Sequence, residues 1–391
     1  MIELTLITLL MILIFLGLLE SYFHEKSLSN LPIRIHVNGA RGKSSVTRLI
    51  AAGLRSGGLK TLAKTTGTSP RIINANGEDR EIFRLRSATI GEQVRLLRSF
   101  AKQKPEAVVI ECMAVNPHYQ WISEHKMIRS TIGVITNIRP DHLDEMGSTI
   151  EDNTMSISNT IPHNGTIVTV IDSENNQVNN ILKRESLKKN TKLFFADNNK
   201  ISSKFMKKFK YLEHVDNVSL AIEVCKQCGV NEKNALEGML KSNPDPGATV
   251  VWNLNFHNNH NNNFVNLFAA NDPSSTYNIF EQLKSLIEDR KVCIFLNTRD
   301  DRRYRTYQLL DLIFIKIKPS IVIIRGEKLP SILEEYRSQN PDIKVIIFSF
   351  SDSKKSIIKS FSEQDNTFII GIGNIVGWGE DFIKRLKRYK S

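Results

Sequence analysis

Cysteine is scarce in this sequence of 391 residues, which contains only four. Cys112, Cys225, Cys228 and Cys293 are too few for a disulfide framework in a chain of this length, so we expect free thiols in a reducing compartment. Cys225 and Cys228 form a C-x-x-C pair in a stretch with the pattern of an amphipathic helix, and no second pair follows. Zinc binding or redox chemistry at this pair is therefore the less favoured interpretation.

Aromatic residues are also few, at 8% of the chain, and the basic residues are dispersed rather than interleaved with them. This pattern argues against a nucleic-acid partner, which would need both on one face. Even so, 53 Lys and Arg against 41 Asp and Glu give a net charge of +12. The excess favours another anionic partner, such as ATP, acidic lipid or an acidic polymer, with an inert basic surface as the alternative.

Long apolar runs are absent except at the N-terminus, where residues 4–19 carry no charge. This run is slightly shorter than the roughly 20 residues that span a bilayer, although flanking residues can extend it. It lacks the positive start and small-residue cleavage site of a signal peptide. We expect residues 1–20 to be a single anchor in the cell membrane. Lys26 and Arg34 follow it and predict that the remainder is cytoplasmic.

Beyond the anchor, short apolar runs alternate with helical periods, as they do in βαβ units. Strands are predicted at IRIHV, AVVIE, TIGVITN, TIVTVID and KLFFAD, and after a turn-rich segment at KVCIFLN, PSIVIIRG, IKVIIFSF and NTFIIGIGN. The predicted fold class is α/β. A central P-loop-type domain with a mostly parallel sheet should span residues 21–245, and a smaller Rossmann-like α/β domain should span residues 246–391.

A glycine-rich loop, HVNGARGKSS at residues 36–45, joins the first strand to a helix. It lacks the first glycine of the common G-x-x-x-x-G-K-[ST] loop, because that position is Val37, and has the shorter form G-x-x-G-K-S. Backbone N–H groups at a helix start receive phosphate, a lysine neutralises it and a serine can ligate Mg²⁺. The predicted ATP-binding residues of this loop are Gly39, Ala40, Arg41, Gly42, Lys43, Ser44 and Ser45.

Acidic and imidazole side chains follow two of the predicted strands. Glu111 ends AVVIE, while Asp141, His142 and Asp144 come after TIGVITN. The carboxyl ends of parallel strands share one edge of a sheet, where ligands of α/β proteins bind. We expect these groups to converge with the loop on one metal and nucleotide site.

The loop, the strand-ending glutamate and T-N-x-x-x-D-H, in this order, resemble the Mur ligase superfamily, which includes folylpolyglutamate synthase. The wider context is similar to the ligase subunits of poly-γ-glutamate synthases, the CapB/PgsB type. The stretches that carry this resemblance are NGARGKSSVTRL, KTTGT, ECMAVNP, DHLDEMG, TIPHNG, PDPGA, AANDPSST and GIGNI.

The resemblance implies roles for individual residues. Ser44, Ser69, Glu111 and His142 would hold the metal, and Lys43, Glu111 and His142 would be catalytic. Asn137 would shape the nucleotide pocket and Asn217 would lie near the adenine. The second domain would contribute Asn271 and Asp272. Apart from the resemblance, Arg299 and Arg302 of the basic stretch NTRDDRRYRTYQ could bind nucleotide or polymer, with a solvated basic loop as the alternative.

The resemblance also implies an activity. The chain would be an ATP-dependent amide ligase that polymerises glutamate through a γ-glutamyl phosphate, with Mg²⁺ or, in its place, Mn²⁺. Its partners would be glutamate, the growing polymer, other membrane subunits of the synthase and a possible homo-oligomer. Two alternatives remain open, namely another Mur-type ligase with a peptidoglycan or folate acceptor, and a membrane-tethered P-loop ATPase for polymer export.

The sequence departs from the family pattern at two places. Many Mur-type enzymes have a lysine roughly 15 residues after the D-H histidine, but the equivalent place is about Ile157, and no lysine occurs between His142 and Lys183. The boundary segment at residues 246–249 reads P-G-A-T where many relatives have an arginine after the glycine. Without the lysine, the site could hold one metal rather than two. Without the arginine, a nucleotide contact could be lost or supplied from elsewhere.

Overall fold

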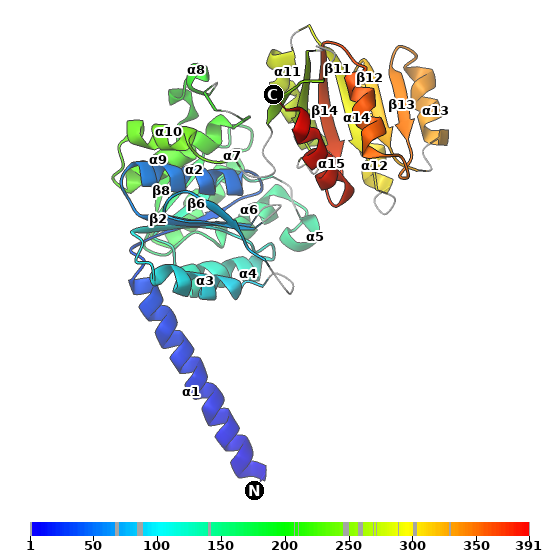
Figure 1. Cartoon of the computed structure of the whole chain (residues 1–391). Helices are drawn as coiled ribbons and strands as arrows, with labels where there is room; N and C mark the ends of the chain where they lie inside the picture. The colour runs from blue at the N-terminus through cyan, green and yellow to red at the C-terminus, as the bar shows by residue number, and fades with distance from the viewer. Residues whose placement is uncertain are drawn as a thin grey trace. The chain divides into compact units, whose positions relative to one another are not determined.

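The chain forms two compact units, Met1–Pro246 and Gly247–Ser391 (Figure 1). The computed structural model describes residues 2–66, 70–83, 89–139, 142–206, 208–209, 211–244, 250–256, 261–268, 270, 272–287, 289–299, 303–327 and 330–390.

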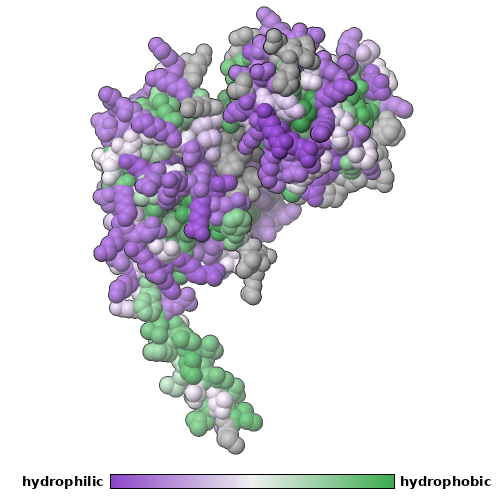
Figure 2. Space-filling model, viewed as in Figure 1, coloured by the Kyte–Doolittle hydropathy of each residue, from purple (hydrophilic) through white to green (hydrophobic). Residues whose placement is uncertain are grey.

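Helix α1 (Ile2–Ser29) contains the apolar N-terminal run. Its large apolar side chains from Ile2 to Leu18 are exposed, and Figure 2 shows them as a hydrophobic rod. It is the one helix in the described chain that is long and apolar enough to cross a membrane. The helix continues past the predicted end of the anchor at residue 20. Its last turns pack on the first unit, where Leu28 is buried and Glu25 pairs with Arg129.

The first unit is built on an eight-stranded sheet with the order β4-β3-β2-β5-β1-β6-β7-β8. The strands are β1 (Ile33–Asn38), β2 (Thr61–Thr65), β3 (Arg71–Ile73), β4 (Asp79–Glu81), β5 (Ala107–Glu111), β6 (Ile132–Ile135), β7 (Thr166–Val170) and β8 (Lys192–Ala196). Strand β1 lies between β5 and β6 and is parallel to both. The carboxyl ends of these three strands therefore meet at one edge. Among the described strands of this sheet, the antiparallel pairs are β2 with β3 and β3 with β4.

Helices cover both faces of this sheet. Helices α2 (Lys43–Ser56) and α9 (Val215–Gln227) pack over Ile35 and Val37 of β1, together with α10 (Glu232–Leu240). The opposite face carries α3 (Glu92–Ala101), α4 (Pro117–Ile122) and the π-helix η1 (Ser123–Ile128). The remaining helices are α5 (Leu143–Met146), α6 (Ile150–Ser158), α7 (Asn176–Lys188), η2 (Asn198–Lys200) and α8 (Ser203–Met206).

The C-x-x-C pair lies at the end of α9 and belongs to the core. Cys225 is fully buried, and a Cβ on Gly53 of α2 would lie 2.7 Å from its sulfur. Burial raises the pKa of Cys225 and raises that of Cys228 to about 11. Both groups are therefore protonated thiols near neutral pH, which suits a packing role.

The second unit contains a six-stranded sheet with the order β13-β12-β11-β14-β10-β9. Its strands are β9 (Val251–Leu254), β10 (Asn262–Asn266), β11 (Lys291–Asn297), β12 (Ile321–Arg325), β13 (Lys344–Phe348) and β14 (Thr367–Gly373), of which only β9 runs antiparallel to its neighbour. The helices are α11 (Pro273–Ile287), α12 (Arg303–Asp311), η4 (Leu312–Ile317), α13 (Pro330–Gln339), α14 (Lys354–Ser362), α15 (Trp378–Leu386) and η5 (Lys387–Tyr389). The expected α/β fold class is confirmed.

A buried ion pair connects β1 to η1 beneath the glycine-rich loop. His36 Nδ1 lies 2.7 Å from Glu124 Oε2, and both side chains are at most 1% exposed. The other carboxylate oxygen of Glu124 accepts the N–H and hydroxyl of Ser130. Burial alone would lower the pKa of His36, but the neighbouring Cys112 sulfur and the Glu124 carboxylate more than offset it and raise this pKa to about 9. The imidazole is therefore cationic at neutral pH.

Glu124→Gln should lower the free energy of unfolding by about 3 kcal/mol at neutral pH, because it removes one partner of a buried pair. The stabilisation from His36 is full below its unfolded pKa near 6.5 and is lost as pH rises through about 9. The gap between wild type and variant in urea unfolding should therefore shrink between about pH 7 and pH 10. Glu281→Gln, which removes an exposed pair with Lys284, is the control and should change neither quantity. A pH-independent gap would contradict the assignment.

Candidate functional site

The loop between β1 and α2 depends on two glycines with positive φ angles. Gly39 has a φ of 134°, and a Cβ there would lie 2.1 Å from the Thr136 hydroxyl oxygen. Gly42 has a φ of 80°, and its Cβ would lie 2.7 Å from Asn217 Oδ1. No side chain larger than hydrogen fits at either position without a shift. The shortened glycine spacing is thus a requirement of this loop.

Residues at the exit of β6 hold the loop in shape. Asn137 accepts the Ala40 N–H with its carbonyl at 3.0 Å and the Arg41 N–H with its side-chain oxygen at 3.1 Å. The Asn137 amide and the Thr136 hydroxyl both donate to the Arg41 carbonyl, at 3.0 and 2.6 Å. Asn137 therefore lies against the loop, and its role in a nucleotide pocket stays a prediction. Thr136 was missed by the sequence reasoning, although it precedes Asn137 in the same motif.

The start of α2 is suited to an anion. Gly42 is its N-cap, no side chain among the described residues caps it, and its first turn contains no acid. The amide groups at such a start and the helix dipole favour negative charge. Lys43 folds back over the loop, where its Nζ donates to the Gly39 carbonyl at 2.6 Å and to the Ala40 carbonyl at 3.4 Å. A cation is thus held beside the free helix start.

Ser44 and Glu111 meet at the same edge of the sheet. The Ser44 hydroxyl donates to Glu111 Oε2 at 2.8 Å, and the Thr66 N–H donates to the same oxygen at 2.7 Å. Glu111 is only 2% exposed, so these two donors orient its carboxylate. A hydroxyl and a carboxylate at this spacing are the oxygen donors that Mg²⁺ or Mn²⁺ takes. Thr66 is a second residue that the sequence reasoning missed.

The structure gives fewer contacts for the other expected site residues of the first unit. Asn217 lies beside Gly42 and donates to Glu213 at 2.7 Å. His142 has a φ of 45°, and its carbonyl accepts the N–H groups of Glu145 and Met146 at the start of α5. Ser69 and Asp141 lie outside the described residues, and Asp144 lies on α5. Within the described residues no three His, Cys, Asp or Glu groups form a metal cluster. The metal roles of Ser69 and His142 stay predictions.

The position that holds a lysine in many Mur-type enzymes is part of the core here. Ile157 on α6 is 1% exposed and packs with Ile135, Ile161 and Leu182. Its apolar surroundings would disfavour a charged side chain.

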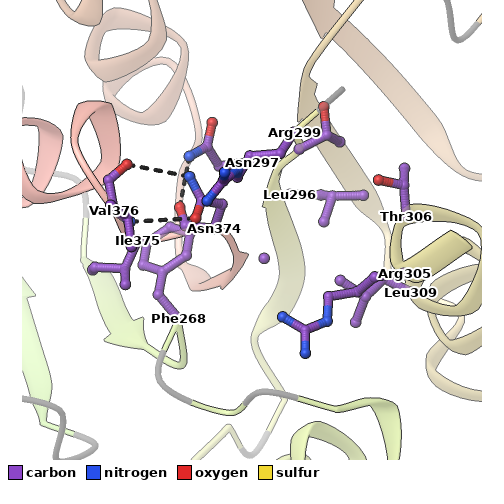
Figure 3. A pocket seen from close by; sticks show the side chains of 12 residues that line it. Phe268, Leu296, Asn297, Arg299, Arg305, Thr306, Leu309, Asn374, Ile375 and Val376 are labelled. Atoms are coloured by element: carbon purple, nitrogen blue, oxygen red, sulfur yellow. Dashed lines mark hydrogen bonds between the residues drawn. The ribbon is translucent and has the colours of Figure 1, made fainter. Parts of the chain in front are cut away.

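The second unit has a pocket of about 110 Å³ at the carboxyl ends of β11 and β14 (Figure 3). Asn297 and Asn374 line one side, where the Asn297 amide donates to the Asn374 carbonyl at 2.6 Å. Arg299 and Arg305 also line the pocket. The position of Arg299 there is consistent with an anion-binding role.

The remaining expected residues of the second unit are only partly described by the structure. Asp272 accepts the N–H and hydroxyl of Ser275, both at 2.7 Å, at the start of α11. Asn271 and Arg302 lie outside the described residues.

Family comparisons agree with this architecture. Residues 37–237 match the Mur ligase middle domain, and residues 251–389 match the poly-gamma-glutamate synthase CapB C-terminal domain. Among solved structures, a folylpolyglutamate synthase/dihydrofolate synthase from Yersinia pestis, complexed with AMPPNP and Mn ion, has a TM-score of 0.66. It is 13% identical, with 94% of this chain and 92% of that chain covered, and so shows the fold.

Two curated relatives match nearly the whole chain. PGA synthase CapB from Bacillus subtilis (strain 168) is 37% identical over 383 residues, which cover 97% of this chain and 96% of that protein. Capsule biosynthesis protein CapB from Bacillus anthracis is 37% identical over 375 residues, 95% of this chain and 80% of that protein. The family expected from the sequence is confirmed: the chain belongs to the CapB family of poly-γ-glutamate synthases, with a Mur ligase-type middle domain.

Proposed function

We propose that this chain is the ATP-dependent amide ligase that polymerises glutamate into poly-γ-glutamate. The observation that carries the proposal is the bonded set of Ser44, Glu111 and Thr66 beside the uncapped start of α2. Such a site can hold a nucleotide triphosphate and a divalent cation, which a ligase needs to activate a carboxylate. Membership of the CapB family supports a glutamate amine as the group that accepts the activated carboxylate.

The reaction consists of two transfers. A glutamate γ-carboxylate oxygen attacks the γ-phosphorus of ATP, the bond to the bridging oxygen breaks and ADP leaves. The amine of a second glutamate then attacks the acyl carbon, phosphate leaves and the nitrogen loses a proton. The first transfer builds charge on phosphate oxygens, so positioning and neutralisation are the main demands on the protein.

The residues of the loop meet these demands. The amide groups at the start of α2 would orient the phosphates and Lys43 would neutralise them. Ser44 and Glu111 would hold Mg²⁺ or Mn²⁺, which would supply positive charge to offset that of the phosphates. Asn137 keeps the loop in shape through its three hydrogen bonds to Ala40 and Arg41.

The pocket of the second unit would take a glutamate or the polymer end. Arg299 and Arg305 can pair with carboxylates, and Asn297 and Asn374 offer amide groups. Helix α1 would anchor the chain to the cell membrane with its catalytic units in the cytoplasm, beside other subunits of the synthase. Glutamate and the growing chain are the proposed substrates, and a homo-oligomer is a further possible assembly.

Trapping of the acyl phosphate tests this function against its alternatives. A purified membrane complex with ATP, Mg²⁺, glutamate and hydroxylamine should yield a glutamyl hydroxamate, ADP and phosphate. ATP hydrolysis without hydroxamate would favour an export ATPase, and release of AMP and pyrophosphate would exclude the activation route. Radiolabelled glutamate should enter an acidic polymer. Its transfer to a folate or peptidoglycan precursor instead would favour another Mur-type ligase.

Lys43→Ala should lower ATP turnover at least about 100-fold, because it removes the cation beside the developing phosphate charge. The melting temperature should change little, since the contribution of Lys43 to the described part of the fold is two loop hydrogen bonds. Lys226→Ala, an exposed substitution on α9, is the matched control and should turn over ATP at the wild-type rate. Wild-type turnover by Lys43→Ala would remove this residue from the site.

Glu111→Gln should weaken Mn²⁺ binding about 10–100-fold in the presence of a non-hydrolysable ATP analogue, and Ser44→Ala should weaken it less, because it removes a neutral donor. Electron paramagnetic resonance of free Mn²⁺ measures this affinity without turnover. Ser56→Ala, near the opposite end of α2, controls for changes in the helix and should bind Mn²⁺ normally. Unchanged Mn²⁺ affinity in Glu111→Gln would contradict the metal assignment.

A further inference from the structure

The end of the second unit exposes five cations within seven residues. They lie on the last turn of α15, on η5 and at the residue that follows η5, and we call them the C-terminal basic surface: Lys384, Arg385, Lys387, Arg388 and Lys390. Where α15 lies in Figure 1, Figure 2 shows strongly hydrophilic side chains. Within the described part of the chain, none of the five forms an ion pair with a carboxylate.

This surface is held in place by the fold. Phe382 and Leu386 of α15 are fully buried, and the Tyr389 ring lies 5.2 Å from that of Phe256. The Asn255 N–H donates to the Tyr389 carbonyl at 2.8 Å, which ties η5 to the end of β9. The cations are therefore carried on a fixed backbone, and less conformational entropy is lost when they bind an anion.

The side chains of the surface are also partly ordered. Lys387 Nζ and Lys390 Nζ each lie 5.9 Å from the centre of the buried Trp252 ring. Cation–π contacts at this distance favour two cations on the same patch despite their mutual repulsion.

Helix stability explains only part of this charge. Lys384 and Arg385 lie in the last turn of α15, where cations interact favourably with the helix dipole. Lys387, Arg388 and Lys390 lie beyond that helix, and like charges three or four residues apart repel. The nearest carboxylates in sequence, Glu380 and Asp381, are in the first turn, and Asp381 pairs with Lys354. An anionic ligand would account for the unbalanced cations.

We propose that the C-terminal basic surface binds the growing γ-glutamyl polymer, an inference that rests on the proposed function. Each added unit leaves one carboxylate on the chain, so the product is a flexible polyanion that suits several lysine and arginine charges. The surface also follows the pocket directly, because Asn374 and Val376 line the pocket and α15 begins at Trp378. Helix α15 has nine residues and so extends about 13 Å from the pocket side toward this surface.

The same observations disfavour a lipid surface. A membrane-binding amphipathic helix needs an exposed apolar face, but Phe382, Ile383 and Leu386 all point into the core. With the polymer held at several points, one end can leave the pocket and rebind before the chain diffuses away. The surface would therefore lengthen the product without changing the chemistry of each addition.

Substitution of all five cations with Gln tests the proposal, and the full chain in detergent is the sample. Fluorescence anisotropy with labelled poly-γ-glutamate should show at least a tenfold loss of affinity, and the salt dependence of binding should flatten. The initial rate of ADP release should stay within twofold of wild type, while the product should become shorter on gels. The control removes five exposed cations of the first unit, namely Lys183, Lys192, Lys200, Lys204 and Lys226, and should keep wild-type affinity and product length.

Each alternative result overturns the proposal. Equal loss of polymer binding in the test and control variants would mean that polymer affinity depends on net charge alone and not on this surface. Unchanged polymer binding together with lost binding to phosphatidylglycerol vesicles would assign the surface to lipid. The anisotropy measurement uses purified polymer and needs no synthesis. It therefore tests polymer binding by the surface separately from the ligase activity, which ADP release reports.

Discussion

The contact between Gly39 and Thr136 is the constraint on which the glycine-rich loop, the proposed nucleotide site, depends. With 2.1 Å between a hypothetical Cβ and the threonine hydroxyl, the loop can pass only if residue 39 has no side chain. This close approach lets Asn137 satisfy the backbone N–H groups of Ala40 and Arg41. The remaining amide groups at the start of α2 are then left for a ligand. The shape of the loop thus depends on the residues that follow β6, Thr136 and Asn137, as well as on the loop itself.

A layer of buried polar groups supports this arrangement from the opposite face of the sheet. Asn38, immediately before Gly39, donates to Gln120 at 2.9 Å and to Thr160 at 3.2 Å. His36 pairs with Glu124 two residues earlier on the same strand. Buried polar groups are costly unless they are paired, so these contacts specify one position for α4, η1 and the turn after α6. The strand that carries the loop is therefore fixed on both sides.

The sequence predicted the parts of the structure that have local signals. Every strand expected from an apolar run exists, and the loop follows its strand as the motif requires. The short strands β3 and β4 escaped prediction because residues such as Arg71, Asp79 and Glu81 do not form an apolar run. Thr66 and Thr136 were missed for a different reason. Their roles depend on contacts with Glu111 and Arg41, which are far away in sequence and come close only when the sheet has formed.

The distribution of charge separates the two chemical demands of polymer synthesis. Transfer of a phosphoryl group needs a few groups at fixed positions, and the residues proposed for it, Lys43, Ser44 and Glu111, are buried or half-buried and bonded to neighbours. Retention of a long polyanion needs many exchangeable contacts, for which exposed lysines and arginines suffice. A net charge of +12 is more than the first task requires. The excess is consistent with the proposed binding of a product that gains a negative charge with every step.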